Sequence, residues 1–350
     1  MKLGICGTLC ALASIIPFVP AAAQEASFHI KAIKIAGNDN VQATAINGHG
    51  AIAATVYAAD TDAPSGVIIK GKTVTTLPAV NDPDFGGFHT AAIDDAGNVL
   101  GWAFRTSDGV PDMFFYQGGT YNTTYEFPLA GIGNASGQPP NPIGLNKRGE
   151  VFFTYFIDIS APTDGAYGIP PNFRNVPALN RYNTIESINW SGMVAGTSYT
   201  LSGADQVFAG RGKNFTSLTP PGATSVKGGF INDKGDVAGT WRDSSNVWHG
   251  FLYSGGTYAS FDMPEAASSM AVTGINGADR VVGTYVSTAD SHQHGFLYNG
   301  TTVSSFGKFN QFDNVVVALN AAGKIIVSNQ LLGNEPAYHS YRVTCSGSGC

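Results

Sequence analysis

Three ionisable side chains stand in segments that are otherwise small or apolar: His89, Glu186 and Lys227. A carboxyl group buried in such a segment has a raised pKa unless it is paired, and a shifted pKa suits a general acid or base. If the fold gathers the three in one pocket, they would serve a lyase or hydrolase. The chain has no Gly-x-Ser-x-Gly elbow, His-Glu-x-x-His pair, phosphate loop or dinucleotide fingerprint.

A second group of residues is suited to binding. Aromatic rings recur at the ends of β-forming segments, and acids and arginines follow them. Ring faces stack on sugars while acids accept hydroxyl hydrogens, although packing between sheets explains such rings more simply. The rings are Tyr57, Trp102, Phe104, Phe156, Tyr199, Trp241 and Tyr285, and the polar residues are Asp60, Asp62, Arg105, Asp108, Asp205, Arg242, Asp243 and Asp290.

An internal repeat of about 44 residues must position these side chains. Every repeat has an Asn or Asp anchor, with Ile or Val five residues later in all seven cases and Gly three residues later in six. A fixed period of this length is typical of repeat architectures. Spaced by 47, 52, 43, 43, 44 and 44 residues, the anchors are Asn47, Asp94, Asn146, Asn189, Asn232, Asn276 and Asn320.

Each repeat predicts four short strands. Examples are Met270 to Ile275, Val281 to Tyr285, His294 to Tyr298 and, one repeat earlier, Thr257 to Phe261, with Gly-rich or Asn-Gly turns between them. Four antiparallel strands per 40–45 residues is the blade pattern of a β-propeller. The pattern predicts an all-β, seven-bladed β-propeller of four-stranded blades.

The two ends of the chain predict how the ring closes. The segment from Phe28 to Ile35 resembles a lone fourth strand, and the last repeat supplies only three strands. The N-terminal strand is therefore expected to complete the seventh blade and remove an open sheet edge. Residues 24–350 form one domain in this scheme.

A propeller also predicts where a site would lie. Five residues before the anchors, near the channel end of each first strand, stand five polar residues and then two apolar ones. We expect the polar ones to line a channel entrance on the face formed by the second-to-third and fourth-to-first strand connections. They are Gln42, His89, Asn141, Thr184 and Lys227, followed by Ala271 and Val315.

Two repeated features favour structure over chemistry. His249 and His294 recur with the repeat, as packing positions do. The acidic neighbours of the anchors, such as Asp95 and Asp233, lack the alternating ligands of a calcium loop and suit turn formation. We expect no metal site and no cofactor.

The repeats resemble those of the bacterial extracellular HAF-repeat family. That family combines Ile-Asn-x-x-Gly-x-Val-x-Gly with His-Ala-Phe-Leu-Tyr, and the present chain has the first pattern from Ile231 to Gly239 and His-Gly-Phe-Leu-Tyr from His249 and from His294. The resemblance covers nearly all of the chain after residue 23. It implies a secreted repeat protein and supplies no catalytic residues.

The N-terminal segment predicts secretion. Lys2, an apolar stretch from Leu9 to Val19 and three alanines suit a signal peptide over residues 1–23, with cleavage near Ala23 and Gln24 and a secreted or periplasmic location. In an oxidising compartment we expect a disulfide between Cys345 and Cys350.

Charge and hydrophobicity exclude some classes of partner and leave others. A net charge of −6 without a basic run argues against nucleic acid, and the mature chain has no membrane span. We expect a monomeric binding module for a glycan, an envelope polymer or a protein. A propeller lyase or hydrolase at the channel mouth is the alternative.

Overall fold

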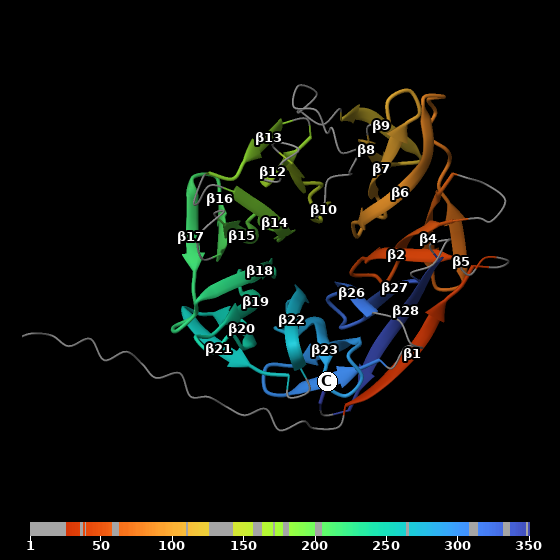
Figure 1. Ribbon diagram of the computed structural model, residues 1–350. Coiled ribbons are helices and arrows are strands. Elements are labelled where there is room, and N and C mark those ends of the chain that lie inside the picture. Colours follow the sequence, from red (N-terminus) through yellow and green to blue (C-terminus); the bar gives the residue numbers. More distant parts are fainter. Residues whose placement is uncertain are drawn as a thin grey trace, which may run out of the picture.

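The chain folds into a ring of seven antiparallel sheets, each of four strands, around a central channel (Figure 1). The predicted seven-bladed β-propeller is confirmed. This computed structural model describes residues 26–35, 38, 40–57, 63–109, 111–125, 143–156, 163–170, 172–177, 182–199, 205–263, 266–307, 314–331, 337–347 and 349–350. The predicted signal peptide and Asn141 lie outside these residues.

Six blades are built from four consecutive strands, ordered from the channel outward. Blade 1 comprises β2 (Val41–Ile46), β3 (Ile52–Val56), β4 (Ser65–Lys70) and β5 (Thr73–Thr76), and blade 2 comprises β6 (Phe85–Ile93), β7 (Val99–Arg105), β8 (Pro111–Gln117) and β9 (Thr120–Tyr125). Blade 3 comprises β10 (Ile143–Leu145), β11 (Val151–Phe156), β12 (Thr163–Ile169) and β13 (Asn172–Asn175), and blade 4 comprises β14 (Tyr182–Ile188), β15 (Val194–Tyr199), β16 (Gln206–Arg211) and β17 (Asn214–Leu218). Blade 5 comprises β18 (Ser225–Ile231), β19 (Val237–Arg242), β20 (Trp248–Ser254) and β21 (Thr257–Phe261), and blade 6 comprises β22 (Ala266–Ile275), β23 (Val281–Ser287), β24 (Gln293–Tyr298) and β25 (Val303–Phe306).

Blade 7 joins the two ends of the chain. It comprises β26 (Asn314–Leu319), β27 (Ile325–Leu331), β28 (Ala337–Ser346) and β1 (Ser27–Ile33), which pairs antiparallel with β28 from Ser27 opposite Ser346 to Ile33 opposite Ser340. The predicted closure by the N-terminal strand is therefore confirmed. A disulfide joins Cys345 to Cys350, with their Cα atoms 5.6 Å apart.

The seven anchors form a hydrogen-bonded ring around the channel. Each side-chain Oδ1 accepts the backbone N–H four residues on, which closes the blade's own turn. In six blades the Asn Nδ2 also donates to the backbone carbonyl of the next anchor. These distances are 2.8 Å for Asn47 to Asp94, 2.9 Å for Asn146 to Asn189, 3.1 Å for Asn189 to Asn232, 3.1 Å for Asn232 to Asn276, 3.2 Å for Asn276 to Asn320 and 3.0 Å for Asn320 to Asn47. Asp94 has no amide to donate, so the ring is interrupted between blades 2 and 3.

The core lies between neighbouring blades. The β-branched residue five positions after each anchor is at most 3% exposed in all seven repeats, which explains why the position never varies in type: Ile52, Val99, Val151, Val194, Val237, Val281 and Ile325. Full burial of such a side chain contributes about 1.5–3 kcal/mol. The described residues include no helix that is long and apolar enough to cross a membrane.

Candidate functional site

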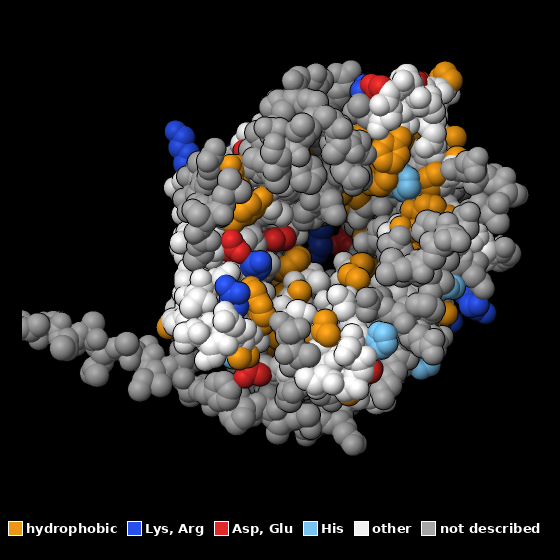
Figure 2. Space-filling model, viewed as in Figure 1, with side chains coloured by type: hydrophobic (Ala, Val, Ile, Leu, Met, Phe, Trp, Pro, Cys, Tyr) orange, Lys and Arg blue, Asp and Glu red, His pale blue; other side chains and the backbone are white. Residues whose placement is uncertain are grey.

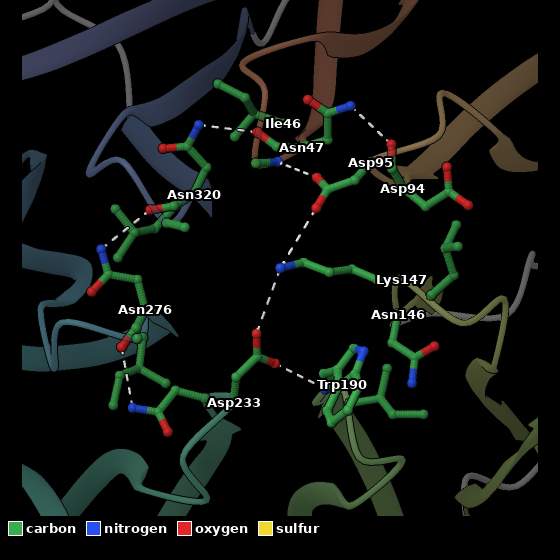
Figure 3. Close-up of a pocket in the computed structure, with 18 of the residues that line it drawn as sticks. Ile46, Asn47, Asp94, Asp95, Asn146, Lys147, Trp190, Asp233, Asn276 and Asn320 are labelled. Atoms are coloured by element: carbon green, nitrogen blue, oxygen red, sulfur yellow. Dashed lines mark hydrogen bonds and ion pairs between the residues drawn. The ribbon is translucent and has the colours of Figure 1, made fainter.

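A cavity of about 220 Å³ opens at one end of the channel, where the turns between the first and second strands of the blades converge. Seven strand-end apolar residues form its wall, and the anchor ring surrounds it (Figure 3). Figure 2 views the ring along the channel and shows basic and acidic side chains deep in the opening. We call this cavity the turn-side mouth.

The residue directly after each anchor points to the turn-side mouth, and its type changes from blade to blade. In Figure 3, Asp95, Lys147, Trp190 and Asp233 extend into the opening. The Lys147 Nζ atom lies 3.5 Å from Asp95 Oδ2 and 3.7 Å from Asp233 Oδ2, so one ammonium spans two carboxylates. The seven residues at this position are Gly48, Asp95, Lys147, Trp190, Asp233, Gly277 and Ala321.

Both carboxylates are held in place by the neighbouring turn. Asp95 Oδ1 accepts the backbone N–H of Gly48 at 2.6 Å, and Asp233 Oδ1 accepts that of Trp190 at 2.9 Å. Each acid thus bonds the preceding blade with one oxygen and faces Lys147 with the other. Because these bonds orient the acids, the charged side of the mouth is preorganised.

The opposite side of the mouth is open. A Cβ atom placed on Gly277 would meet no atom within 4 Å, and the Ala321 side chain is short. Trp190 is 55% exposed and offers an aromatic face beside the charged groups. An exposed ring, two oriented acids and one ammonium around open space can bind a polar ligand, but they supply no nucleophile paired with a base.

The turn-side mouth lies at the end of the channel opposite to the entrance that the sequence predicts, and Asp95 and Asp233, which the sequence indicates as turn formers, line it. The sequence carries one usable signal, because the residue after the anchor changes type from repeat to repeat while the apolar residue before the anchor does not. The contacts of Lys147 could not be predicted, since they join turns of three different blades.

The three predicted catalytic side chains have separate partners. The His89 ring stacks on Trp102 with centroids 3.7 Å apart, and its Nδ1 lies 3.3 Å from the Tyr57 hydroxyl. Lys227 Nζ lies 3.4 Å from Asp205 Oδ2. Within the described part of the chain, no hydrogen bond or ion pair links His89, Glu186 and Lys227 to one another. They belong to blades 2, 4 and 5, and each takes part in its own local network.

Glu186 occupies a β-bulge of β14, which turns its carboxyl group toward blade 5. Its Oε1 accepts the Thr197 hydroxyl at 2.9 Å and its Oε2 accepts the backbone N–H of Gly229 at 2.9 Å. Burial raises the pKa of this carboxyl to about 8, and the two hydrogen bonds only partly oppose the effect. Glu186 is therefore mostly a neutral acid at pH 7, as the sequence analysis expected of an unpaired acid.

Burial has the opposite consequence for His89. It disfavours the imidazolium and lowers the pKa of His89 to about 4, so the ring is neutral at pH 7. The Tyr57 hydroxyl donates to Gln42 Oε1 at 3.0 Å, so Gln42 is part of the same network. Near the equivalent end of blade 4, the Thr163 and Thr184 hydroxyls are 3.2 Å apart and the Tyr199 hydroxyl lies 2.7 Å from that of Thr163.

Two of the predicted ligand-contacting rings have structural roles. Tyr285 is 1% exposed and belongs to the core between blades 5 and 6, which corrects its assignment as a binding residue, because it has no surface to offer. Trp241 stacks on His249 with centroids 4.4 Å apart and donates from Nε1 to Ser260 Oγ at 2.9 Å. Arg242 places its guanidinium 5.6 Å from the Trp248 ring centroid.

The loop acids and the repeated histidines satisfy one another. His249 Nε2 lies 3.5 Å from Asp243 Oδ2, and its Nδ1 contacts Asp262. His294 Nε2 lies 3.0 Å from Asp290 Oδ1. Each histidine ties a connecting loop to its own blade, as the structural interpretation predicts. These acids therefore offer fewer free lone pairs than their positions suggested.

Comparisons with known proteins agree on the architecture. No protein-family model matches the sequence, and no curated protein matches it. The structure is similar to the β-propeller domain of the Trilobed protease from Pyrococcus furiosus, with a TM-score of 0.55, 9% identity, and 88% of this chain and 94% of that one covered. It is also similar to the acylaminoacyl peptidase of Pyrococcus horikoshii, with a TM-score of 0.51, 9% identity, and 90% of this chain and 50% of that one covered. At these identities the likeness is one of fold, and the chain is a β-propeller.

Proposed function

We propose that the chain is a secreted, non-enzymatic binding module of the HAF-repeat kind, and that the turn-side mouth binds a glycan of the cell envelope or its surroundings. The observation that carries the proposal is the convergence of Asp95, Lys147, Trp190 and Asp233. The residue type at this position changes from blade to blade, so the repeat itself does not fix it, and the four residues gather at one cavity.

The chemistry of the mouth suits a sugar. The exposed face of Trp190 can stack on a pyranose ring, the outward oxygens of Asp95 and Asp233 can accept hydroxyl hydrogens, and Lys147 can donate. The open side near Gly277 leaves room for the rest of a chain to enter. A protein ligand remains the competing partner, and the test below separates the two.

The proposal is tested with glycan arrays and with pull-downs of cell-envelope material. Trp190→Ala should weaken binding about tenfold, because an aromatic stack contributes on the order of 1 kcal/mol beyond the area it buries. Asp233→Asn should weaken it less, since the amide oxygen still accepts from Trp190 N–H. Val247→Ala is the matched control, because Val247 is 51% exposed and lies outside the mouth.

Two results would overturn the proposal. If the wild-type protein binds no glycan and no envelope polymer, the ligand class is wrong. If Trp190→Ala binds as tightly as wild type, the turn-side mouth is the wrong site. Retention of a protein alone, sensitive to Trp190→Ala, would assign the mouth to a protein partner instead.

The alternative of a lyase or hydrolase rests on Glu186, whose neutral carboxyl group at pH 7 resembles a general acid. It requires a catalytic partner, and the contacts of His89 and Lys227 are made elsewhere. Turnover of an envelope polysaccharide that is abolished by Glu186→Gln would favour this alternative over the binding module.

A further inference from the structure

The groove between blade 7 and blade 1 is filled differently from the other six. At the outer rim of every blade, the third and fourth strands place two residues opposite each other in register. In five blades this pair includes an aromatic ring, whereas blade 1 has Ile69 opposite Val74 and blade 7 has Val343 opposite Ile30. The five pairs with a ring are Tyr116–Tyr121, Gly168–Phe173, Gly210–Phe215, Tyr253–Tyr258 and Tyr298–Val303. In blade 7 the ring is that of Phe28, two residues before Ile30 on β1.

These rings fill the space toward the preceding blade. The Tyr121 hydroxyl reaches the Pro78 carbonyl of blade 1 at 2.7 Å, and Tyr298 stacks on Phe261 of blade 5 with centroids 4.1 Å apart. Phe28 lies 5.0 Å from Phe306 of blade 6 by the same measure. Blade 1 has no such ring, so space remains beside it.

A cavity of about 280 Å³ occupies this place, and we call it the seam cavity. Its apolar floor consists of Ile33 from β1 and Ile52, Ile69 and Val74 from blade 1. The strand β1 lies next to β28 and beside the β4–β5 hairpin at one edge of the ring (Figure 1). The cavity therefore exists only when the N-terminal strand has closed the ring.

Among the residues that the structure describes, the seam cavity is lined by four basic side chains and by no acid. The basic residues are Lys31, Lys34, Lys72 and Arg342. Lys31 and Arg342 stand directly opposite each other on β1 and β28. Like charges at such positions are unfavourable in a sheet. The chain as a whole carries a net charge of −6, so this local excess of positive charge does not reflect its composition.

We propose that the seam cavity binds an oxyanion carried by an amphiphilic molecule. The guanidinium of Arg342 can hold two oxyanion oxygens at once, and the lysines add positive charge around it. The aliphatic floor accepts the apolar part that follows the anionic head. Binding relieves the repulsion between Lys31 and Arg342 and bridges β1 to blade 1. This site is separate from the turn-side mouth and does not depend on the function proposed for it.

The test uses decyl phosphate below its micelle concentration as the probe, measured by calorimetry and by the shift in melting temperature. Wild-type protein should bind it and melt at a higher temperature, because a ligand of the folded state stabilises that state. Inorganic phosphate should bind at least about tenfold more weakly, since it lacks the apolar contacts of several buried methylenes. Decyltrimethylammonium, with the same chain and the opposite charge, should not bind.

Two variants and one control separate the contribution of the apolar space from that of the positive charge. Val74→Tyr installs the ring that four other blades carry at this position of the fourth strand, and it should abolish binding while leaving the fold intact. Lys72→Ala should weaken binding roughly threefold to tenfold, and added salt should reduce the difference. Lys70→Ala is the control, because Lys70 belongs to the same hairpin but does not line the cavity.

Several outcomes would overturn the proposal. Unchanged affinity in Val74→Tyr would show that the probe binds elsewhere. If inorganic phosphate bound as tightly as decyl phosphate, the apolar floor would not contribute to binding. If decyltrimethylammonium bound as tightly as decyl phosphate, or if Lys70→Ala and Lys72→Ala lost equal affinity, the four basic residues would not determine binding.

Discussion

Glu186 is an acid that the fold holds between two hydrogen-bond donors, and no cation among the described residues pairs with it. A carboxyl group in unfolded protein loses its proton near pH 4.5, whereas in the folded chain the pKa of Glu186 is about 8. Between these values the folded state retains a proton that the unfolded state releases. Stability from this residue is therefore lost as pH rises from about 4.5 to 8, by up to about 1.4 kcal/mol per pH unit.

Glu186→Gln should remove this dependence. The amide can accept from Gly229 N–H through its oxygen and donate to the Thr197 hydroxyl, and it carries no charge at any pH. We expect the variant to be more stable than wild type at pH 8.5 and nearly equal to it at pH 5, as measured by urea unfolding at both values. A stability difference that does not change with pH would show that Glu186 titrates normally.

At the scale of the elements, the anchor side chain in the turn after each first strand makes two kinds of hydrogen bond. The first is the bond between the anchor's Oδ1 and the backbone N–H four residues on, and Asp94 accepts it as well as any asparagine. The second, donation across the blade boundary, could not be predicted, because it depends on how closely two turns 43 to 52 residues apart approach each other. The preference for asparagine at six of seven anchors is explained by this donation.

Asn276→Asp tests the second bond while leaving the first intact. The carboxylate still accepts from Arg280 N–H, but it cannot donate to the Asn320 carbonyl, which it now faces with a negative charge. We expect a loss of about 1–3 kcal/mol in unfolding free energy by urea titration. Asn299→Asp is the control, because Asn299 uses only its acceptor oxygen, toward Thr301 and Thr302. Equal losses in both variants would contradict a role for the ring.

The same distinction separates what the sequence could predict of fold and site. Strand order, blade number and ring closure could be predicted, because they follow from a repeat along one chain. Residues such as Val237 and Val281, at the same place in successive repeats, indicate that repeat. The turn-side mouth and the seam cavity arise where side chains from different blades meet. Lys147 lies 52 residues from Asp95 and 86 from Asp233 along the chain. The spacing of these residues along the chain does not indicate that their side chains come into contact.

At the scale of the whole molecule, the ring is held shut by β1. A double substitution, His29→Pro with Ile30→Pro, should open it, because successive N–H groups alternate in direction and one of the two must face β28. We expect a loss of about 3 kcal/mol or more and faster hydrogen exchange in β26, β27 and β28. His29→Ala with Ile30→Ala is the control. Unchanged exchange in the proline variant would show that the ring is stable without its closing strand.

Pairing of β1 with β28 also dictates the order in which the protein can be assembled. Ser27 and Ser346 are neighbours in the folded sheet but 319 residues apart in the chain, and joining ends so distant costs about 5 kcal/mol of chain entropy before any contact compensates it. The strand synthesised first is thus the last to find its partner. Six blades can form as the chain emerges, each beside the one before, but β1 stays unpaired until β28 has been made. The time spent in that unfinished form, and with it the exposure to aggregation through an open sheet edge, is set by a single docking event between the two ends.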